Sequence, residues 1–340
     1  MFKKVKKIYS DIHVKRLISI FVVDLKYFTL NVAFWRFLCG LPAIKIKFPK
    51  IYIYFYSKLQ RSIKSILLER CRPIFDDFNK QNIILENDSR FEEKNVWVFW
   101  WQGEENAPLL VKKCISSIRY NSGVDNVYVL SKLNYYKYAT IPEYIIKKFE
   151  KGQIEKAHFS DILRMALLCQ RGGLWIDATV FCSKKLPDEI FNYPFFTCRN
   201  TNKIFYNSNL FCWTPFIMGS QKSSPITELM LNSLLAYWKD VTLAIDYLFL
   251  DLILELIYEN VPSVKKQMDN LACNNEQVLA MLKEMKSDIP YSEERLYDLL
   301  SSNTFFFKLS WKYKFKEFSN DGQKTLYYHF LNSSNDFQNK

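Results

Sequence analysis

The chain has 340 residues, of which 49% are hydrophobic and 17% aromatic, and this composition excludes a largely disordered protein. The length allows one large domain with an appendage, or two domains. The formal net charge is +12, and residues 1–75 hold 16 Lys/Arg against Asp11, Asp24 and Glu69. A basic segment on a near-neutral body predicts attraction to an anionic partner, either a nucleic acid or a membrane surface.

The N-terminal segment mixes these cations with large apolar side chains. Residues 15–38 (KRLISIFVVDLKYFTLNVAFWRFL) predict a helix with a broad apolar side and cationic margins. Charged residues interrupt the most hydrophobic window, so we expect no transmembrane span, and no cleavage site follows to suggest a secretory signal. We expect residues 1–75 to bind an anionic membrane surface, with simple packing on the body as the alternative. Nucleic acid is not expected as a partner, because no recognition motif is present.

The polar stretch 76–95 predicts a boundary, which divides the chain into a basic, aromatic-rich helical arm at 1–85 and a body at 86–340. In the body, strands alternate with helices. Strands are predicted at 96–101, 126–131 and 174–181, and helices at 109–122, 142–152 and 157–173. Gly172 and Gly173 end the last of these helices. This alternation predicts an α/β fold with a mostly parallel, doubly wound sheet, in which ligands bind beyond the carboxyl ends of the strands.

The pattern weakens after residue 187. Residues 195–200 and 210–220 are typical of strands or loops, and 224–240 and 241–260 of added C-terminal helices. The eight cysteines are scattered without a C-x-x-C pair, which indicates reduced thiols in a cytoplasmic protein. With only three histidines, a zinc site built from His and Cys is not expected.

Polar side chains lie at strand ends or on the helix before a strand. The segment Trp100–Gly103 follows the first strand, and Asp177 ends the third. Asp161 and Arg164 are three residues apart, so they share one face of their helix. We expect these groups to meet at one cleft. Plainer interpretations remain open: a surface ion pair between Asp161 and Arg164, a turn cap at Asp177, and core packing of Trp100 or Trp101.

The combined pattern SDILRMALL…RGGLWIDATVF resembles the S-D-x-x-R … G-G-x-(Y/W)-x-D core of the capsular polysaccharide synthesis family. That family is related to a group of mannosyltransferases and, more distantly, to the clostridial glucosylating toxins, and it has the GT-A glycosyltransferase fold. The resemblance spans residues 95–182. It implies a hexosyltransferase that moves a sugar from a nucleotide-sugar, with UDP as the default, with retention of anomeric configuration. The alternative is a catalytically inactive protein of this fold that binds polysaccharide or nucleotide-sugar.

The resemblance also implies roles for individual residues. Asp161, Arg164 and Asp177 would be the catalytic set. Donor binding would involve the same three residues together with Trp100, which would stack on the base, Gln102, Gly103, Ser131, Thr179 and Asp246.

The metal motif of the resembling enzymes is altered in this chain. Asp177 matches the first acid of D-x-D, but Thr179 stands at the second position and is a weaker, neutral ligand. We expect Mn²⁺ or Mg²⁺ held by Asp177 and His329, with neutralisation of the diphosphate by Arg164 and lysines as the alternative. The acceptor implied is a lipid-linked oligosaccharide of capsular or other surface polysaccharide synthesis. The arm would then hold a cytoplasmic protein peripherally on the inner face of the plasma membrane.

Overall fold

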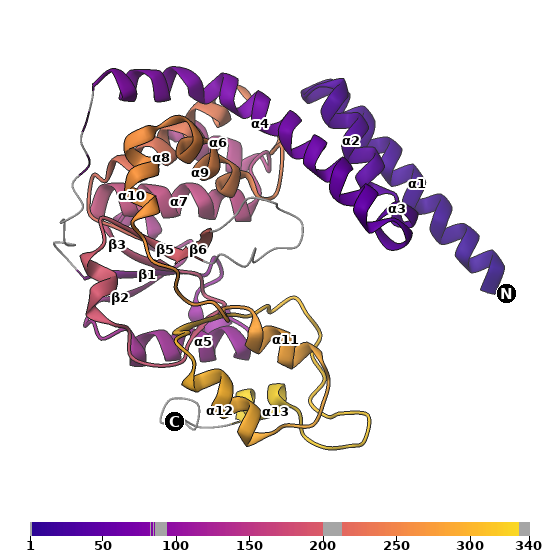
Figure 1. Ribbon diagram of the computed structural model, residues 1–340, viewed down its shortest axis with the longest axis vertical. Helices are drawn as coiled ribbons and strands as arrows, with labels where there is room; N and C mark the ends of the chain where they lie inside the picture. Colours follow the sequence, from indigo (N-terminus) through magenta and orange to yellow (C-terminus); the bar gives the residue numbers. More distant parts are fainter. Residues whose placement is uncertain (1, 82, 84, 86–93, 200–212, 333–340) are drawn as a thin grey trace.

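The structure, a computed structural model, describes residues 2–81, 83, 85, 94–199 and 213–332, with side chains from residue 14 onward. A central sheet lies between helical layers, with a long helical arm on one side and a C-terminal subdomain at the other end (Figure 1). Within these residues, three short 3₁₀ helices occupy connections: η1 (Glu104–Asn106), η2 (Tyr135–Lys137) and η3 (Asp188–Asn192).

The central sheet has five strands in the order β2-β1-β3-β6-β5. Their bounds are β1 Val96–Phe99, β2 Val127–Leu130, β3 Gly173–Ile176, β5 Phe195–Arg199 and β6 Trp213–Ser220. β1 is parallel to both β2 and β3, whereas β6 is antiparallel to β3 and to β5. Four of the five strands therefore run in the same direction, and only β6 runs against them. The predicted α/β class with a mostly parallel sheet is confirmed.

The described part of the protein has two separate hydrophobic cores, and the side chains of β1 point alternately into one and the other. Trp97 and Phe99 face a core shared with α6 (Glu143–Glu150), α7 (Lys156–Arg171), α8 (Pro225–Asp240) and α9 (Phe249–Asn260). Val96 and Val98 face α5 (Leu109–Asn121) and the C-terminal subdomain. Both faces of the strand are therefore buried, which explains its continuous apolar sequence.

The Gly172–Gly173 pair ends α7 and starts β3, as predicted. Both residues have positive φ, 68° and 98°. A Cβ on Gly172 would lie 2.6 Å from the backbone nitrogen of Lys222, and one on Gly173 would lie 2.5 Å from the carbonyl oxygen of Asn95. Only glycine fits this close approach, so the pair fixes how the helix returns to the sheet.

The single strand predicted at 174–181 is wrong, because the chain turns at residues 177–179. The backbone N–H of Val180 donates to the carbonyl oxygen of Asp177 over 2.9 Å, which closes the turn. β4 (Val180–Cys182) then pairs antiparallel with β7 (Phe306–Lys308) in a second, two-stranded sheet. The apolar pattern continues across the turn, so it did not reveal the break.

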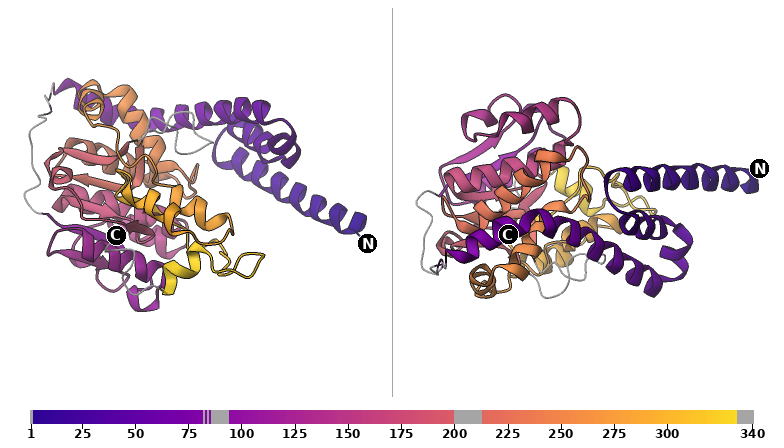
Figure 2. Two further views of the ribbon diagram at one scale, coloured as in Figure 1. Left: turned by 60° about the horizontal axis from the view of Figure 1, so that its bottom comes forward. Right: turned by 90° about the horizontal axis from the view of Figure 1, so that it is seen from above.

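The arm consists of α1 (Phe2–Tyr27), α2 (Leu30–Gly40), α3 (Pro42–Lys47) and the first half of α4 (Pro49–Lys80). These helices project away from the sheet in Figures 1 and 2. The one helix predicted at 15–38 is two, because the Thr29 hydroxyl caps α2 by accepting from the N–H of Val32. No helix in the described ranges is both long and apolar enough to cross a bilayer.

The second half of α4 belongs to the body. Leu59, Ile63, Leu67 and Phe75 are buried in the same core as α8 and α9. The polar stretch expected to begin at residue 76 therefore starts inside a helix. The boundary expected between residues 85 and 86 borders residues outside the described part of the chain.

The helix predicted at 241–260 starts later, at Phe249. Residues 241–248 form a loop in which the Asp246 carboxylate accepts from the N–H of Leu248 over 2.8 Å. The C-terminal subdomain contains α11 (Ala280–Lys286), α12 (Glu293–Ser301), β7 and α13 (Leu326–Asn332), and α10 (Pro262–Asp269) precedes it. Every cysteine in the described part is a free thiol.

Candidate active site

A cavity of about 460 Å³ lies beyond the carboxyl ends of β1 and β3. Trp100 borders it at the end of β1, and Asp161 and Arg164 reach it from α7. Asp177 and Thr179 come from the turn after β3. The C-terminal segment 308–312 closes the other side. The cavity thus collects most of the predicted site residues at the edge where α/β sheets bind ligands.

Asp177 is held at the centre of this cluster by its backbone and by its side chain. Its N–H donates to the carbonyl oxygen of Phe216 on β6 over 2.9 Å, which extends the sheet by one residue. Its Oδ1 accepts from Nε1 of Trp175 at 2.8 Å and from a guanidinium N–H of Arg164 at 3.2 Å. Its Oδ2 accepts from Nζ of Lys308 at 2.6 Å.

Arg164 joins the two acids that the sequence singled out. Its side chain is 6% exposed, and its guanidinium donates to Oδ1 of Asp161 at 3.0 Å as well as to Asp177. The guanidinium also lies over the Trp175 ring, 4.9 Å from the ring centroid. The Asp161–Arg164 pair is therefore an element of the cavity wall rather than a solvated surface pair.

The charge state of Asp177 follows from competing effects. Burial favours the neutral acid and pushes its pKa up, but the charges of Lys308 and Arg164 and the hydrogen bonds from Lys308 and Trp175 outweigh it. The pKa of Asp177 is therefore below its ordinary value, and the group is a carboxylate between two cations.

Lys308 and Asp251 are cavity residues that the sequence analysis missed. Nζ of Lys308 also donates to Oγ1 of Thr179 over 2.9 Å, so one ammonium bridges both ends of the Asp177–Thr179 triplet. Asp251, on the first turn of α9, is 8% exposed. Burial raises the pKa of Asp251 well above its ordinary value, and the Asp161 charge raises it further. An acid inside the apolar run LFLDLILELI was the one available signal for Asp251.

Trp100 and Trp101 point to different environments, as strand alternation predicts. Trp100 lines the cavity and meets Trp311 edge-to-face, with centroids 5.5 Å apart. Trp101 packs on Phe149 and Phe159 in the core. Tyr247, on the loop before α9, also lines the cavity and is 71% exposed.

Four of the predicted donor-binding residues are not among those that line the cavity: Gln102, Gly103, Ser131 and Asp246. Gly103 and Gln102 form the turn after β1: the Gly103 N–H donates to the carbonyl oxygen of Trp100, and the Gln102 carbonyl accepts from Asn106. Ser131 closes the turn after β2, where its hydroxyl accepts from the N–H of Leu133.

Asp246 and His329 lie apart from the cavity. Asp246 lines a neighbouring hollow together with Arg36 and His158, and burial raises its pKa. His329, on α13, stacks on Tyr291 with ring centroids 4.0 Å apart.

The donor set at Asp177 does not fit a divalent cation as arranged. Each oxygen of Asp177, and the hydroxyl of Thr179, already accepts from a cation or from an indole N–H. Mn²⁺ and Mg²⁺ need several oxygen ligands converging on one point. Within the described residues, no group of three or more His, Cys, Asp or Glu side chains is placed to hold a metal ion.

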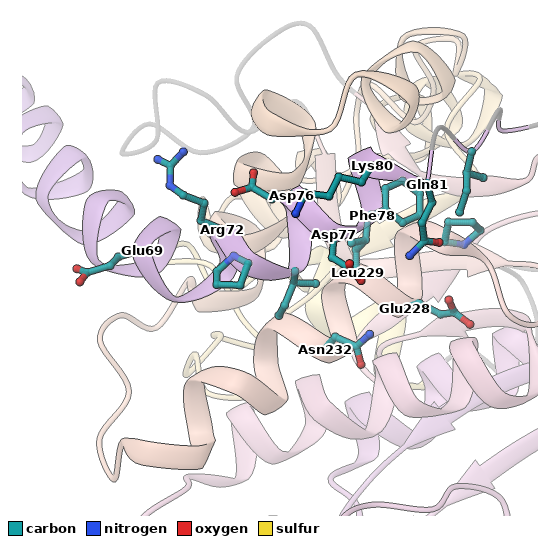
Figure 3. Close-up of a pocket in the computed structure, with 14 residues that line it drawn as sticks. Glu69, Arg72, Asp76, Asp77, Phe78, Lys80, Gln81, Glu228, Leu229 and Asn232 are labelled. Carbon is teal, nitrogen blue, oxygen red and sulfur yellow. The ribbon is translucent and has the colours of Figure 1, made fainter.

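A larger hollow of about 870 Å³ lies between the end of α4 and the start of α8 (Figure 3). Its charged residues are of both signs and all exposed: Glu69, Arg72, Asp76, Asp77, Lys80 and Glu228. The hollow thus has none of the buried, mutually paired charges that distinguish the cavity at β1 and β3.

The structure is thus an α/β protein with a charged cavity, bordered by tryptophans, at the carboxyl edge of its sheet. Residues 47–330 match the family model described as capsular polysaccharide synthesis protein, and the chain belongs to this family. The family resemblance predicted from the SDILR and GGLWID motifs is therefore confirmed.

Two individual proteins are also similar. One is "O-glycosyltransferase braB" of Annulohypoxylon truncatum, 30% identical over 109 residues, which covers 29% of this chain and 26% of that protein. The other is the solved structure "PaToxG Glycosyltransferase", with a TM-score of 0.38 and 17% identity. That match covers 61% of this chain and 83% of the other.

Proposed function

We propose that the chain is a glycosyltransferase that moves a hexose from a nucleotide-sugar, with UDP as the expected nucleotide, to a lipid-linked oligosaccharide of surface polysaccharide synthesis. The observation that carries this proposal is the convergence of Arg164 and Lys308 on Asp177 within a cavity bordered by Trp100. Membership of the capsular polysaccharide synthesis family and similarity to a protein named as an O-glycosyltransferase support it.

The cavity offers a complementary group for each part of a nucleotide-sugar. The Trp100 and Trp311 rings suit a planar base. Arg164 and Lys308 suit the diphosphate, because a leaving diphosphate gains negative charge as the glycosidic bond breaks. Asp161 suits the sugar hydroxyls, since a carboxylate accepts hydrogen bonds from them.

The charge pairing favours a retaining reaction without a covalent intermediate. Asp161 and Asp177 are both paired with cations, and the pKa of Asp251 is raised, so these cavity carboxyls are poorly suited to act as a nucleophile. We propose attack on the face that the diphosphate leaves. The acceptor oxygen forms the new bond to the anomeric carbon, the old bond breaks with its electron pair on the diphosphate, and the diphosphate takes the hydroxyl proton.

The arm supports a membrane-bound acceptor. More than half of the exposed large hydrophobic side chains in the described residues lie between Val14 and Tyr54. Lys15, Arg16 and Lys26 are exposed on the same helix as Ile18 and Val22. Apolar area combined with cations suits an anionic lipid surface, where each Lys or Arg contributes about 1 kcal/mol. We propose peripheral attachment to the inner face of the plasma membrane.

The test is release of nucleoside diphosphate from a panel of nucleotide-sugars, with and without Mn²⁺. Release from one donor, even slow hydrolysis without acceptor, would support the proposal and identify the sugar. A thermal shift without release would support donor binding and call for lipid-linked acceptors in the same assay. Neither release nor a thermal shift with any donor would contradict the proposal, and binding of polysaccharide would then favour the inactive alternative.

A further inference from the structure

The position of the Lys308 side chain is fixed by main-chain contacts of Lys308 and of the residue that follows it. In the β4–β7 ladder, Lys308 lies opposite Val180, the residue that follows Thr179. The next residue, Leu309, donates its N–H to the carbonyl oxygen of Thr179 over 2.8 Å. These contacts bring β7 alongside the turn, so Nζ of Lys308 reaches Asp177 and Thr179 from a fixed base.

The surroundings also restrain the ammonium group. The Lys308 side chain is 21% exposed, and its Nζ lies 5.0 Å from the centroid of the Phe216 ring. An ammonium has three donor hydrogens, and two of them are directed to Oδ2 of Asp177 and Oγ1 of Thr179. Because Lys308 lines the cavity, the third hydrogen is available to a ligand oxygen there.

Within the paired cluster the charges cancel: Arg164 and Lys308 bring two positive charges, Asp177 lies between them, and Asp161 pairs with the far side of Arg164. Lys312, which also lines the cavity, adds a further cation, so the lining can receive a phosphate. The positive charge of Lys308 thus lies on the side of Asp177 away from Arg164 and Asp161. A diphosphate placed against Lys308 would meet a cation that the protein already holds in place.

We propose that the Lys308 ammonium performs the task for which a divalent cation would otherwise be required: it binds the diphosphate of the donor and stabilises the negative charge on the departing nucleoside diphosphate. This inference rests on the proposed function. It assigns a catalytic role to a residue of the C-terminal segment, outside the SDILR and GGLWID motifs. Donor binding and turnover are then independent of added metal.

The test measures binding of UDP, GDP and ADP to the full-length protein by calorimetry, once in EDTA and once in Mn²⁺. For the wild type we expect the same dissociation constant in both buffers, within a factor of about two. Lys308→Met should weaken binding roughly tenfold or more, the usual loss for a hydrogen bond to a charged group. Lys308→Arg should retain most of the affinity, because it keeps the charge.

Lys286→Met is the matched control, because Lys286 lies at the end of α11 with its ammonium over the Tyr313 ring. It should bind as the wild type does. The wild-type comparison of EDTA with Mn²⁺ needs no variant, so the inference remains testable even if Lys308→Met does not fold.

Binding by the wild type only in Mn²⁺, or unchanged affinity in a folded Lys308→Met variant, would overturn the inference and leave the proposed function intact. Failure of the wild type to bind any of the three nucleotides in either buffer would overturn both. The two failures are therefore distinguishable.

Discussion

Arg164 of α7 donates to Asp177 beyond β3 over 3.2 Å and so joins the helix to the end of the strand that follows it. The same guanidinium binds Asp161 and covers Trp175. One buried cation therefore orders both acids of the predicted motif and the aromatic ring beneath them. Since these contacts lie at the edge of the cavity, the packing of α7 on β3 also sets the geometry of the site.

Arg164→Ala should lower nucleoside diphosphate release by about 100-fold, because the diphosphate loses a preorganised cation. It should also lower the free energy of unfolding by about 1–3 kcal/mol, because Asp161 and Asp177 lose a buried donor. Turnover assays and urea denaturation measure the two effects. Arg119→Ala is the control for turnover, since Arg119 forms a bidentate pair with Glu104 and neither residue lines the cavity. An equal loss of turnover in the two variants would contradict the site assignment.

Asp177→Asn should abolish detectable transfer while the far-UV circular dichroism spectrum stays that of the wild type. The amide keeps the shape of Asp177 but not the negative charge that holds Lys308 and Arg164 in place. Asp188→Asn serves as the comparison, because Asp188 forms an exposed ion pair with Lys94. Near-normal turnover by Asp177→Asn would rule out the role given to this carboxylate.

Asp251→Asn should stabilise the protein at higher pH. The pKa of Asp251 is raised in the folded state, so folding favours its protonated form. Its contribution to stability is fully present below the ordinary carboxyl pKa of about 4 and is lost as the pH rises through the raised value. The difference in Tm between variant and wild type should therefore grow in favour of the variant from pH 4.5 to 8.5, as measured by calorimetry. A difference that stays constant over this range would contradict the assignment of a protonated Asp251.

Ile18→Asp combined with Val22→Asp should weaken binding to anionic vesicles by about tenfold or more, because two apolar contacts on one face of α1 are replaced by charges that anionic lipids repel. Both side chains are at least half exposed, so the fold should tolerate the change. Vesicle flotation with anionic and with neutral lipid measures the effect. Leu133→Asp is the control, at an exposed position on the body. Deleting residues 1–75 is a poor test, since it removes buried residues of α4 such as Leu67.

The sequence predicted those parts of the site that lie within one local unit. Helical periodicity puts Asp161 and Arg164 on one face of α7, and Asp177 lies at the end of the strand that follows this helix. Local spacing in the sequence was therefore enough to predict that all three residues lie at one site. Lys308 could not be found this way, because it lies 131 positions from Asp177 and reaches it only through the β4–β7 pairing. Asp246 and His329 were chosen mainly for their residue types, and the structure places both outside the cavity.

The fold was predictable to a similar extent. Apolar runs and the two glycines located the helices and strands around the first β–α–β units. The turn at Asp177 and the late start of α9 depend on hydrogen bonds that the N–H groups of Val180 and Leu248 donate, and hydrophobic periodicity does not report them. The burial of α4 in the core likewise depends on tertiary packing, because its sequence carries the same basic and aromatic composition as the exposed arm.

The location of Lys308 on β7 determines when, during synthesis, the chain becomes able to bind its ligand. Domains begin to fold from the N-terminal side as the chain emerges. The central sheet, α7 and the Asp177 turn are complete in sequence by residue 220, whereas β7 is translated almost ninety residues later. A nascent or truncated chain that ends before residue 308 would carry the motif acids and Arg164 but lack the second cation. In that chain, ligand binding would require β7 to be synthesised first.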